Sequence, residues 1–91
     1  MRLAAKIDSN HQEITTAFMG LGCSVQTLAA YGRGVPDLLV GDRGNTHVVE
    51  VKMPKGELTT EQEAWRLGWR GDYSIVRSVE DVVKVVKGWR K

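Results

Sequence analysis

Three charged residues on two neighbouring apolar segments have types and spacing suited to chemistry on phosphates. Asp37 stands just before the apolar residues Leu38 to Val40, and Glu50 and Lys52 alternate with valines in the next apolar segment. Because side chains alternate between the two faces of a strand, Glu50 and Lys52 share a face. Two carboxylates offer the hard oxygen ligands that Mg²⁺ prefers, and a lysine beside them can orient an attacking water or neutralise negative charge. Together the three residues predict a metal-dependent phosphate site.

The pair Glu50 and Lys52 also has a simpler interpretation. The residues around them are apolar: Val48, Val49 and Val51. Such a segment predicts a buried strand, where a charge is costly unless it is paired or bound to a metal. A glutamate and a lysine two residues apart on one face can simply neutralise each other, so this pair alone does not distinguish a site from a structural ion pair.

A helix over residues 8–21 is predicted to precede these segments. Four apolar residues recur there at the spacing of one helix face: Ile14, Ala17, Phe18 and Leu21. Two pairs near its start have the spacing of a capping box: Ser9 with Gln12, and Asn10 with Glu13. We expect one of these pairs to hold the beginning of the helix.

The remaining elements are three strands, a helix, a strand and a last helix. The predicted strands cover residues 23–30, 36–41, 47–53 and 73–76, and the second and third form a hairpin around Gly41–Asn45. Polar residues that can cap helices precede both later helices: Thr59 with Gln62, Thr60 with Glu63, and Ser78. The order αβββαβα indicates an α/β domain in which helices flank a small mixed sheet.

The complete pattern is more specific than its parts. It runs Gly34-Val35-Pro36-Asp37-Leu38-Leu39-Val40, then nine residues, then Glu50-Val51-Lys52, with Gln62 and Trp65 on the following helix. This pattern resembles the PD-(D/E)XK nuclease superfamily, and in particular the stand-alone VRR-NUC domains, small nucleases found largely in phages and bacteria. The resemblance runs from about Glu13 to Val83 and implies a restriction-endonuclease-like core.

The resemblance also implies roles for the charged residues. It makes Asp37 and Glu50 ligands of Mg²⁺, for which Mn²⁺ can substitute, and it makes the backbone carbonyl of Val51 a further ligand. Lys52 matches the catalytic lysine of the family. The implied reaction is hydrolysis of a phosphodiester by a water held between Lys52 and the metal.

Two more polar residues match the family, and each has an alternative role. Glu13 matches an acidic residue that such nucleases often carry on the first helix as a metal ligand, but it can also cap that helix with Asn10. Gln62 matches a glutamine that positions the active site or contacts the DNA backbone. Alternatively, Gln62 is only a helix cap, and Trp65 and Trp69 on the same face belong to the core.

Homodimers acting on branched DNA, including four-way (Holliday) junctions, are typical of family members without extra domains. The resemblance therefore implies a Mg²⁺-dependent, structure-selective endonuclease. Two alternatives remain: a sequence-specific or nicking restriction-type endonuclease, and a non-catalytic DNA-binding module on the same fold. The short chain leaves little room for recognition loops, and the intact set of Asp37, Glu50 and Lys52 argues against a module without chemistry.

Apolar residues near the end of the chain favour the dimer. The chain has three tryptophans, and the last helix carries an apolar stripe: Val79, Val82, Val83, Val86 and Trp89. A sheet of four short strands cannot easily cover so much apolar surface. We therefore expect part of it to be buried between two subunits.

Two basic regions are candidates for contact with DNA. Arg33 lies in the glycine-rich loop before Asp37, although an ordinary turn also explains these glycines. The last helix ends with cations that no acid offsets: Lys84, Lys87, Arg90 and Lys91. These cations equally suit the C-terminal dipole of a solvated helix. His11 and His47 are left unassigned, because lone histidines are more often surface or core groups than ligands.

The composition sets the remaining bounds. Ninety-one residues, 42% hydrophobic and 26% charged, predict a single globular domain over residues 1–91. The net charge of +2 permits binding to a polyanion without requiring it. The sequence has a single cysteine, Cys23, which excludes an internal disulfide. It has no cluster of cysteines and histidines that would indicate a zinc site. No apolar run approaches the roughly 20 residues of a membrane span, so we expect a cytoplasmic protein of a bacterial or phage-infected cell.

Overall fold

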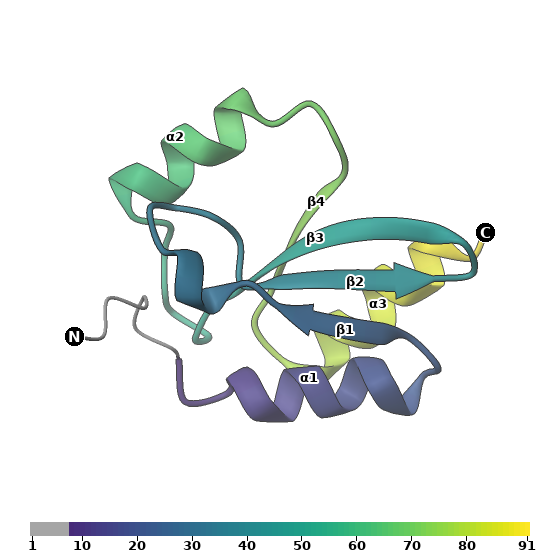
Figure 1. Ribbon diagram of the computed structural model, residues 1–91. Helices are drawn as coiled ribbons and strands as arrows, with labels where there is room; N and C mark the ends of the chain where they lie inside the picture. Colours follow the sequence, from purple (N-terminus) through teal and green to yellow (C-terminus); the bar gives the residue numbers. More distant parts are fainter. Residues whose placement is uncertain (1–7) are drawn as a thin grey trace.

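The computed structural model describes residues 8–91 as a mixed sheet with helices around it (Figure 1). Its elements are α1 (His11–Gly20), β1 (Ser24–Thr27), the 3-10 helix η1 (Ala29–Tyr31), β2 (Leu38–Asp42), β3 (Asn45–Val51), α2 (Thr60–Gly68), β4 (Tyr73–Val76) and α3 (Val79–Trp89). The predicted order αβββαβα is confirmed, with η1 as an addition.

The first strand is shorter than predicted. It ends at Thr27, although the Leu28 amide still donates to the Asp37 carbonyl of the neighbouring strand end at 2.6 Å. The Ala29 amide then donates to the Thr27 hydroxyl at 3.3 Å and the Tyr31 amide to the Leu28 carbonyl at 3.0 Å, and these bonds turn the chain into η1. Residues 28–30, which the sequence suggested as strand, therefore begin the loop that leads to Asp37.

The four strands are arranged in the order β1-β2-β3-β4. The first two pairings are antiparallel, and β4 lies parallel to β3, so the sheet is mixed as predicted. The β2–β3 hairpin closes through Arg43 and Gly44, whose φ angles of 52° and 86° are those of a tight two-residue turn. Because the turn needs only two residues, β2 and β3 extend to Asp42 and Asn45, beyond their predicted ends.

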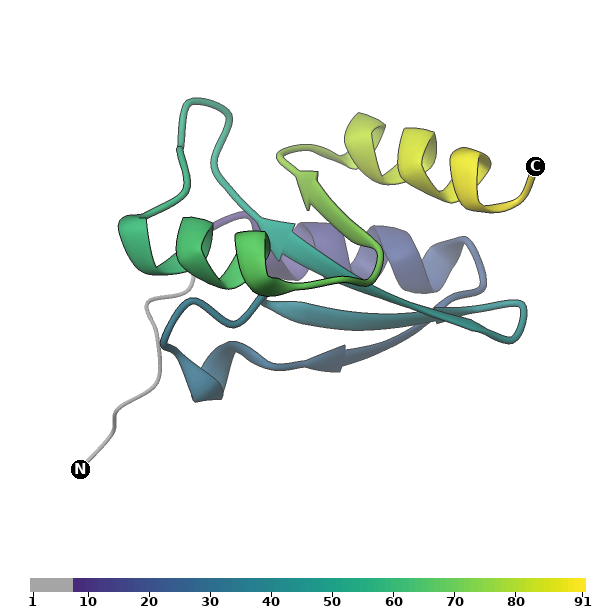
Figure 2. The ribbon, with the colours of Figure 1, turned by 90° about the horizontal axis from the view of Figure 1, so that it is seen from above.

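The two outer helices α1 and α3 pack together against the sheet, and α2 stands apart from both (Figures 1 and 2). The buried core joins residues of α1, the strands and α3: Ile14, Phe18, Cys23, Leu38, Val40, Val49, Val51, Val76, Val82 and Val86. Trp89 stacks on Phe18 with ring centroids 5.8 Å apart. Most of the apolar stripe of α3 is thus covered within one chain, and the expectation that it forms a subunit interface does not hold for Val82 and Val86.

The helix caps differ between the first helix and the later two. In α2, Thr59 and Gln62 form the predicted capping box, and in α3 the Ser78 hydroxyl accepts from the Asp81 amide at 3.1 Å. Neither capping box predicted for α1 forms, since Asn10 occupies the N-cap without a capping hydrogen bond. Its side-chain amide instead donates to the carbonyls of Lys52 and Arg77, at 3.1 and 3.2 Å. Asn10 therefore ties the beginning of α1 to the ends of β3 and β4.

The end of α3 is anchored by an ion pair. The Arg90 guanidinium donates to the buried Asp42 carboxylate at 2.8 Å and to the Leu21 carbonyl at 2.6 Å. The hydrogen bond from Arg90 lowers the pKa of Asp42. Arg90 is thereby engaged within the protein, and of the four terminal cations only Lys84, Lys87 and Lys91 keep the role of candidate DNA contacts. Within residues 8–91, none of the helices has both the length and the apolar character needed to cross a bilayer.

Candidate active site

Asp37 and Glu50 are brought face to face by the β2–β3 hairpin. In this pairing Leu38 lies opposite Val49, and Asp37 and Glu50 are opposite each other one residue beyond this last pair. Because the core residues Leu38 and Val49 face α1 and α3, the side chains of Asp37 and Glu50 lie on the other face of the sheet. The Asp37 carboxylate accepts a hydrogen bond from the Val51 amide at 2.9 Å. This bond fixes the carboxylate across the end of β3. The predicted convergence of the two acids follows from an ordinary hairpin register.

Glu50 is the most unusual charged residue of the described chain, because only 1% of it is exposed. One carboxylate oxygen, Oε2, accepts from the Gln62 side chain at 3.1 Å and lies 4.0 Å from Nζ of Lys52. The other, Oε1, is buried and has no partner among residues 8–91. Burial, together with the negative charge of Asp37, raises the pKa of Glu50 to about 8 against the opposing charge of Lys52. Two carboxyl groups placed in this way need a proton or a cation.

Gln62 caps α2 and also contacts Glu50. Its side-chain oxygen accepts from the Thr59 amide at 2.9 Å as part of the cap, while its side-chain nitrogen donates to Glu50. The cap thus fixes which end of the amide faces the carboxylate. The first turn of α2 holds Glu50 in position, although no residue of α2 is fully buried.

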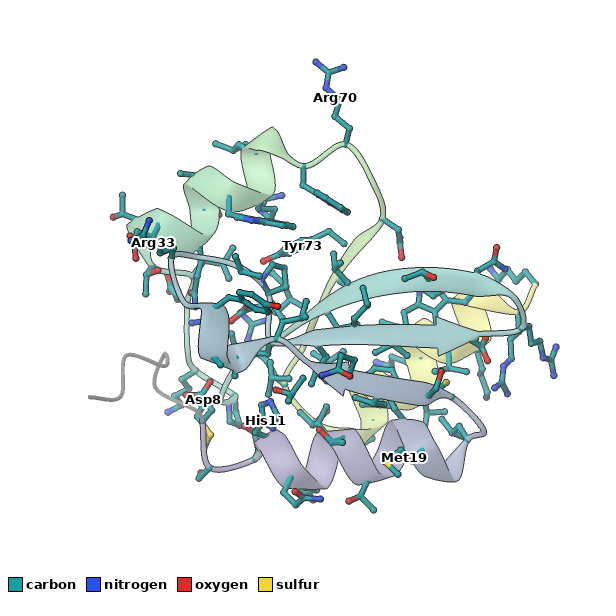
Figure 3. All side chains as sticks on the ribbon, in the orientation of Figure 1. Asp8, His11, Met19, Arg33, Arg70 and Tyr73 are labelled. Atoms are coloured by element: carbon teal, nitrogen blue, oxygen red, sulfur yellow. The ribbon has the colours of Figure 1, made fainter. Side chains whose placement is uncertain are left out.

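A close approach between the loop before Asp37 and the beginning of α2 completes this arrangement. Gly34 has a φ of +83°, and a Cβ atom there would lie 2.4 Å from the carbonyl oxygen of Glu61. Only glycine fits such a position. The Gly34 of the sequence pattern therefore lets the loop that carries Asp37 contact the helix that carries Gln62. Arg33, exposed in the same loop, lies beside the beginning of α2 (Figure 3).

Glu13 is not brought to these residues. It is exposed on α1 and lines a shallow surface depression with Met53, Pro54 and Arg77. Among residues 8–91, no three Asp, Glu, His or Cys side chains group closely enough to hold a metal. Asp8, just before α1, is the acid from this part of the chain whose charge contributes to the raised pKa of Glu50. Helical periodicity could not single out Asp8, since it precedes the first turn of α1.

The two histidines have different surroundings. His47 stacks on Trp89 with ring centroids 3.7 Å apart, and its Nδ1 contacts the Asp72 carboxylate. It is a packed residue of the region around α3. His11 lies near Asp8 at the beginning of α1 (Figure 3), and its Nε2 has no partner among the described residues. Neither histidine joins Asp37 and Glu50.

Tyr73 is a site residue that sequence reasoning missed. It begins β4 and pairs with Val48, two positions before Glu50 on the neighbouring strand. Its side chain projects from β4 beneath α2 (Figure 3), with the ring 6.2 Å from that of Trp65. Burial raises the pKa of Tyr73 to about 12, and the charges of Glu50 and Asp37 contribute to this shift. No local sequence signal could have found it, because its position depends on the parallel pairing of two strands.

The pKa of Glu50 leads to a prediction about stability without metal. In EDTA, the free energy of unfolding is expected to fall as the pH rises from about 4.5 to about 8. In this window the folded protein holds a proton that the unfolded chain has released, so each increase in pH favours unfolding, by a total on the order of a few kcal/mol. Above the pKa of Glu50 in the folded protein, the free energy of unfolding should no longer change with pH through this group.

Chemical denaturation at a series of pH values checks this expectation. Glu50→Gln should remove most of the slope, because an amide cannot titrate. Glu63→Gln is the matched control, since the Glu63 carboxylate is half-exposed and paired with Arg66 at 2.6 Å. Equal slopes for the wild type and Glu50→Gln would contradict the assignment.

The chain is similar in sequence and in fold to a nuclease domain of known structure. No family model matches the sequence, and neither does any curated protein. Among solved structures, a VRR_NUC domain matches with a TM-score of 0.71 and 30% sequence identity, over 86% of this chain and 90% of that domain. The agreement thus extends over nearly the whole of both chains, at the level of sequence as well as fold. On the strength of this match, the chain belongs to the VRR-NUC family.

Proposed function

We propose that this protein is a Mg²⁺-dependent endonuclease that hydrolyses phosphodiester bonds of DNA. The observation that carries the proposal is the convergence of Asp37, Glu50 and Lys52 at one end of the sheet, where Gln62 fixes Glu50. A buried carboxyl beside a second carboxylate and a lysine is costly for a fold of this size. Such a cluster is typical of a catalytic site.

The residues present fit a divalent cation. Glu50 offers an oxygen without a partner among residues 8–91, and Asp37 keeps one oxygen beyond the bond to Val51. Mg²⁺ usually takes one or two protein carboxylates and fills its other positions with water and substrate phosphate. Asp37, Glu50 and the carbonyl of Val51 would hold the ion, and Mn²⁺ could replace it. When bound, it would supply positive charge to the phosphate and acidify water. Glu13 does not belong to this proposed site.

Lys52 and Gln62 have separate tasks in the proposed reaction. The Lys52 ammonium, largely buried beside Glu50, carries donors that can orient an attacking water and stabilise the negative charge that develops on the phosphoryl oxygens. Gln62 keeps the Glu50 carboxylate in one orientation through its bond to the helix cap. Arg33, at the edge of the site, is a candidate contact for a neighbouring phosphate of the DNA backbone.

We further propose that the active unit is a homodimer that cuts branched DNA. Apolar surface remains uncovered on α2 and just after it, where Leu67 is 73% exposed and Trp69 is 43% exposed. Large apolar side chains that remain exposed in this way can be covered by a second subunit. A two-fold dimer presents two identical sites related by an axis, which suits symmetric cleavage of a four-way junction.

Light scattering and a cleavage panel test this proposal together. At micromolar concentration the protein is expected to have the mass of a dimer, and with Mg²⁺ it should cut a four-way junction faster than flap, splayed or linear DNA. Labelling each strand of the junction in turn shows whether the cuts are symmetric. A monomer, or a preference for linear duplex, would favour a nicking or restriction-type nuclease. Binding without any cleavage would favour a DNA-binding module.

A further inference from the structure

The hydroxyl group of Tyr73 is buried and has no hydrogen-bond partner among residues 8–91. A buried polar group left unpaired destabilises the folded state, so nearly all such groups in proteins find a partner. The centroid of the Tyr73 ring lies 6.2 Å from that of Trp65. The missing partner therefore requires an explanation.

The surroundings of this hydroxyl indicate what the partner is. The parallel pairing of β3 and β4 places Tyr73 beside Val48, two positions from Glu50 on the same face of the sheet. Burial raises the pKa of Tyr73, and the charges of Glu50 and Asp37, the residues that would hold the cation, contribute to this shift against the opposing charge of Arg66. Glu50 also has one buried oxygen for which residues 8–91 provide no partner. A single ligand bound here could give a partner both to the Tyr73 hydroxyl and to this Glu50 oxygen. That ligand must offer an acceptor to the phenol, whose pKa of about 12 keeps it protonated at neutral pH.

A phosphate group meets this requirement. Its oxygens accept hydrogen bonds, and the cation held by the two acids would attract it to this place. We propose that the Tyr73 hydroxyl donates a hydrogen bond to a phosphoryl oxygen of the DNA strand being cut, and that Tyr73 is thus a further catalytic residue. The proposal rests on the nuclease function proposed above and adds a contact from β4 to the residues of the hairpin and α2.

Tyr73→Phe tests the proposal, because it removes only the hydroxyl and keeps the ring against Trp65. With saturating Mg²⁺ and DNA, the rate of a single turnover should fall roughly a hundredfold, as expected for the loss of one donor to a phosphoryl oxygen in the transition state. The melting temperature should stay the same or rise, since an unpaired buried hydroxyl has been deleted. A purely structural tyrosine would instead lose stability together with activity.

Thr15→Val is the matched control. The Thr15 hydroxyl on α1 is also buried without a partner among the described residues, and valine keeps the branched shape. This variant should match Tyr73→Phe in stability while cleaving at the wild-type rate. Titration with Mn²⁺ adds a second measurement, in which Tyr73→Phe should bind the ion as tightly as the wild type.

The outcomes separate this proposal from the function on which it rests. If the wild type cleaves DNA and Tyr73→Phe cleaves equally well, the assignment of Tyr73 is wrong and the nuclease function stands. Weaker Mn²⁺ binding by Tyr73→Phe would also overturn it, because the residue would then act through the metal ligands. If the wild type cleaves no DNA with either Mg²⁺ or Mn²⁺, both proposals fail.

Discussion

Lys52→Ala is expected to lower the rate of DNA cleavage by about a thousandfold or more while leaving the fold intact. The lysine lies 4.0 Å from the Glu50 carboxylate, directly after β3, the strand that carries Glu50. Its removal takes away the charge and the donors that the proposed reaction needs. Folding tolerates the loss, because Glu50 without Lys52 beside it holds its proton more readily and no buried negative charge is left uncompensated.

Two further variants separate chemistry from simple neutralisation. Lys52→Arg keeps the positive charge but changes the shape and donors of the group, so it should remain nearly inactive if Lys52 takes part in the reaction. If the lysine serves only to pair with Glu50, arginine should restore activity. Lys55→Ala is the control for a general loss of positive charge, since this lysine is exposed in the turn after β3. Gel assays at saturating DNA, with circular dichroism of each variant, give the comparison.

Removal of divalent cations is expected to reduce cleavage to the background level. Glu50 is held in a buried position with one oxygen that has no partner in the described part of the chain, and Asp37 is fixed beside it, so the two acids repel each other unless a cation or a proton lies between them. In excess EDTA no cleavage should be seen, and Mg²⁺ or Mn²⁺ should restore it. Ca²⁺ is larger and more flexible in its coordination, so it should support DNA binding with little cleavage.

The position of the ion and its dependence on pH give independent checks. Mn²⁺ soaked into crystals should appear at Asp37 and Glu50, and its affinity should increase from about pH 6 to pH 8 as Glu50 loses its proton. Glu50→Gln should lose both the ion and the cleavage. Full activity in excess EDTA would rule out the proposed metal dependence, and an ion bound elsewhere would refute this site.

The sequence alone determined the features that depend on short stretches of chain. The alternation of side chains along a strand placed Glu50 and Lys52 on one face, and a tight turn then brought Asp37 opposite Glu50. The caps of α2 and α3 were predictable for the same reason, because a cap joins residues only three apart. These local rules, with the family resemblance, predicted the order of elements and the centre of the site.

Other features were decided by contacts between residues far apart in the sequence. Asn10 has the spacing of a cap, but its amide bonds to two strand ends that only the folded sheet brings to it. Arg90 appeared to be a free cation until the fold placed Asp42 beside it. The position of Tyr73, opposite Val48 and two positions from the level of Glu50, depends on the parallel pairing of β3 and β4, which joins residues far apart in the sequence. Tertiary structure chooses among the partners that a polar side chain could take, because burial makes the unpaired alternatives costly.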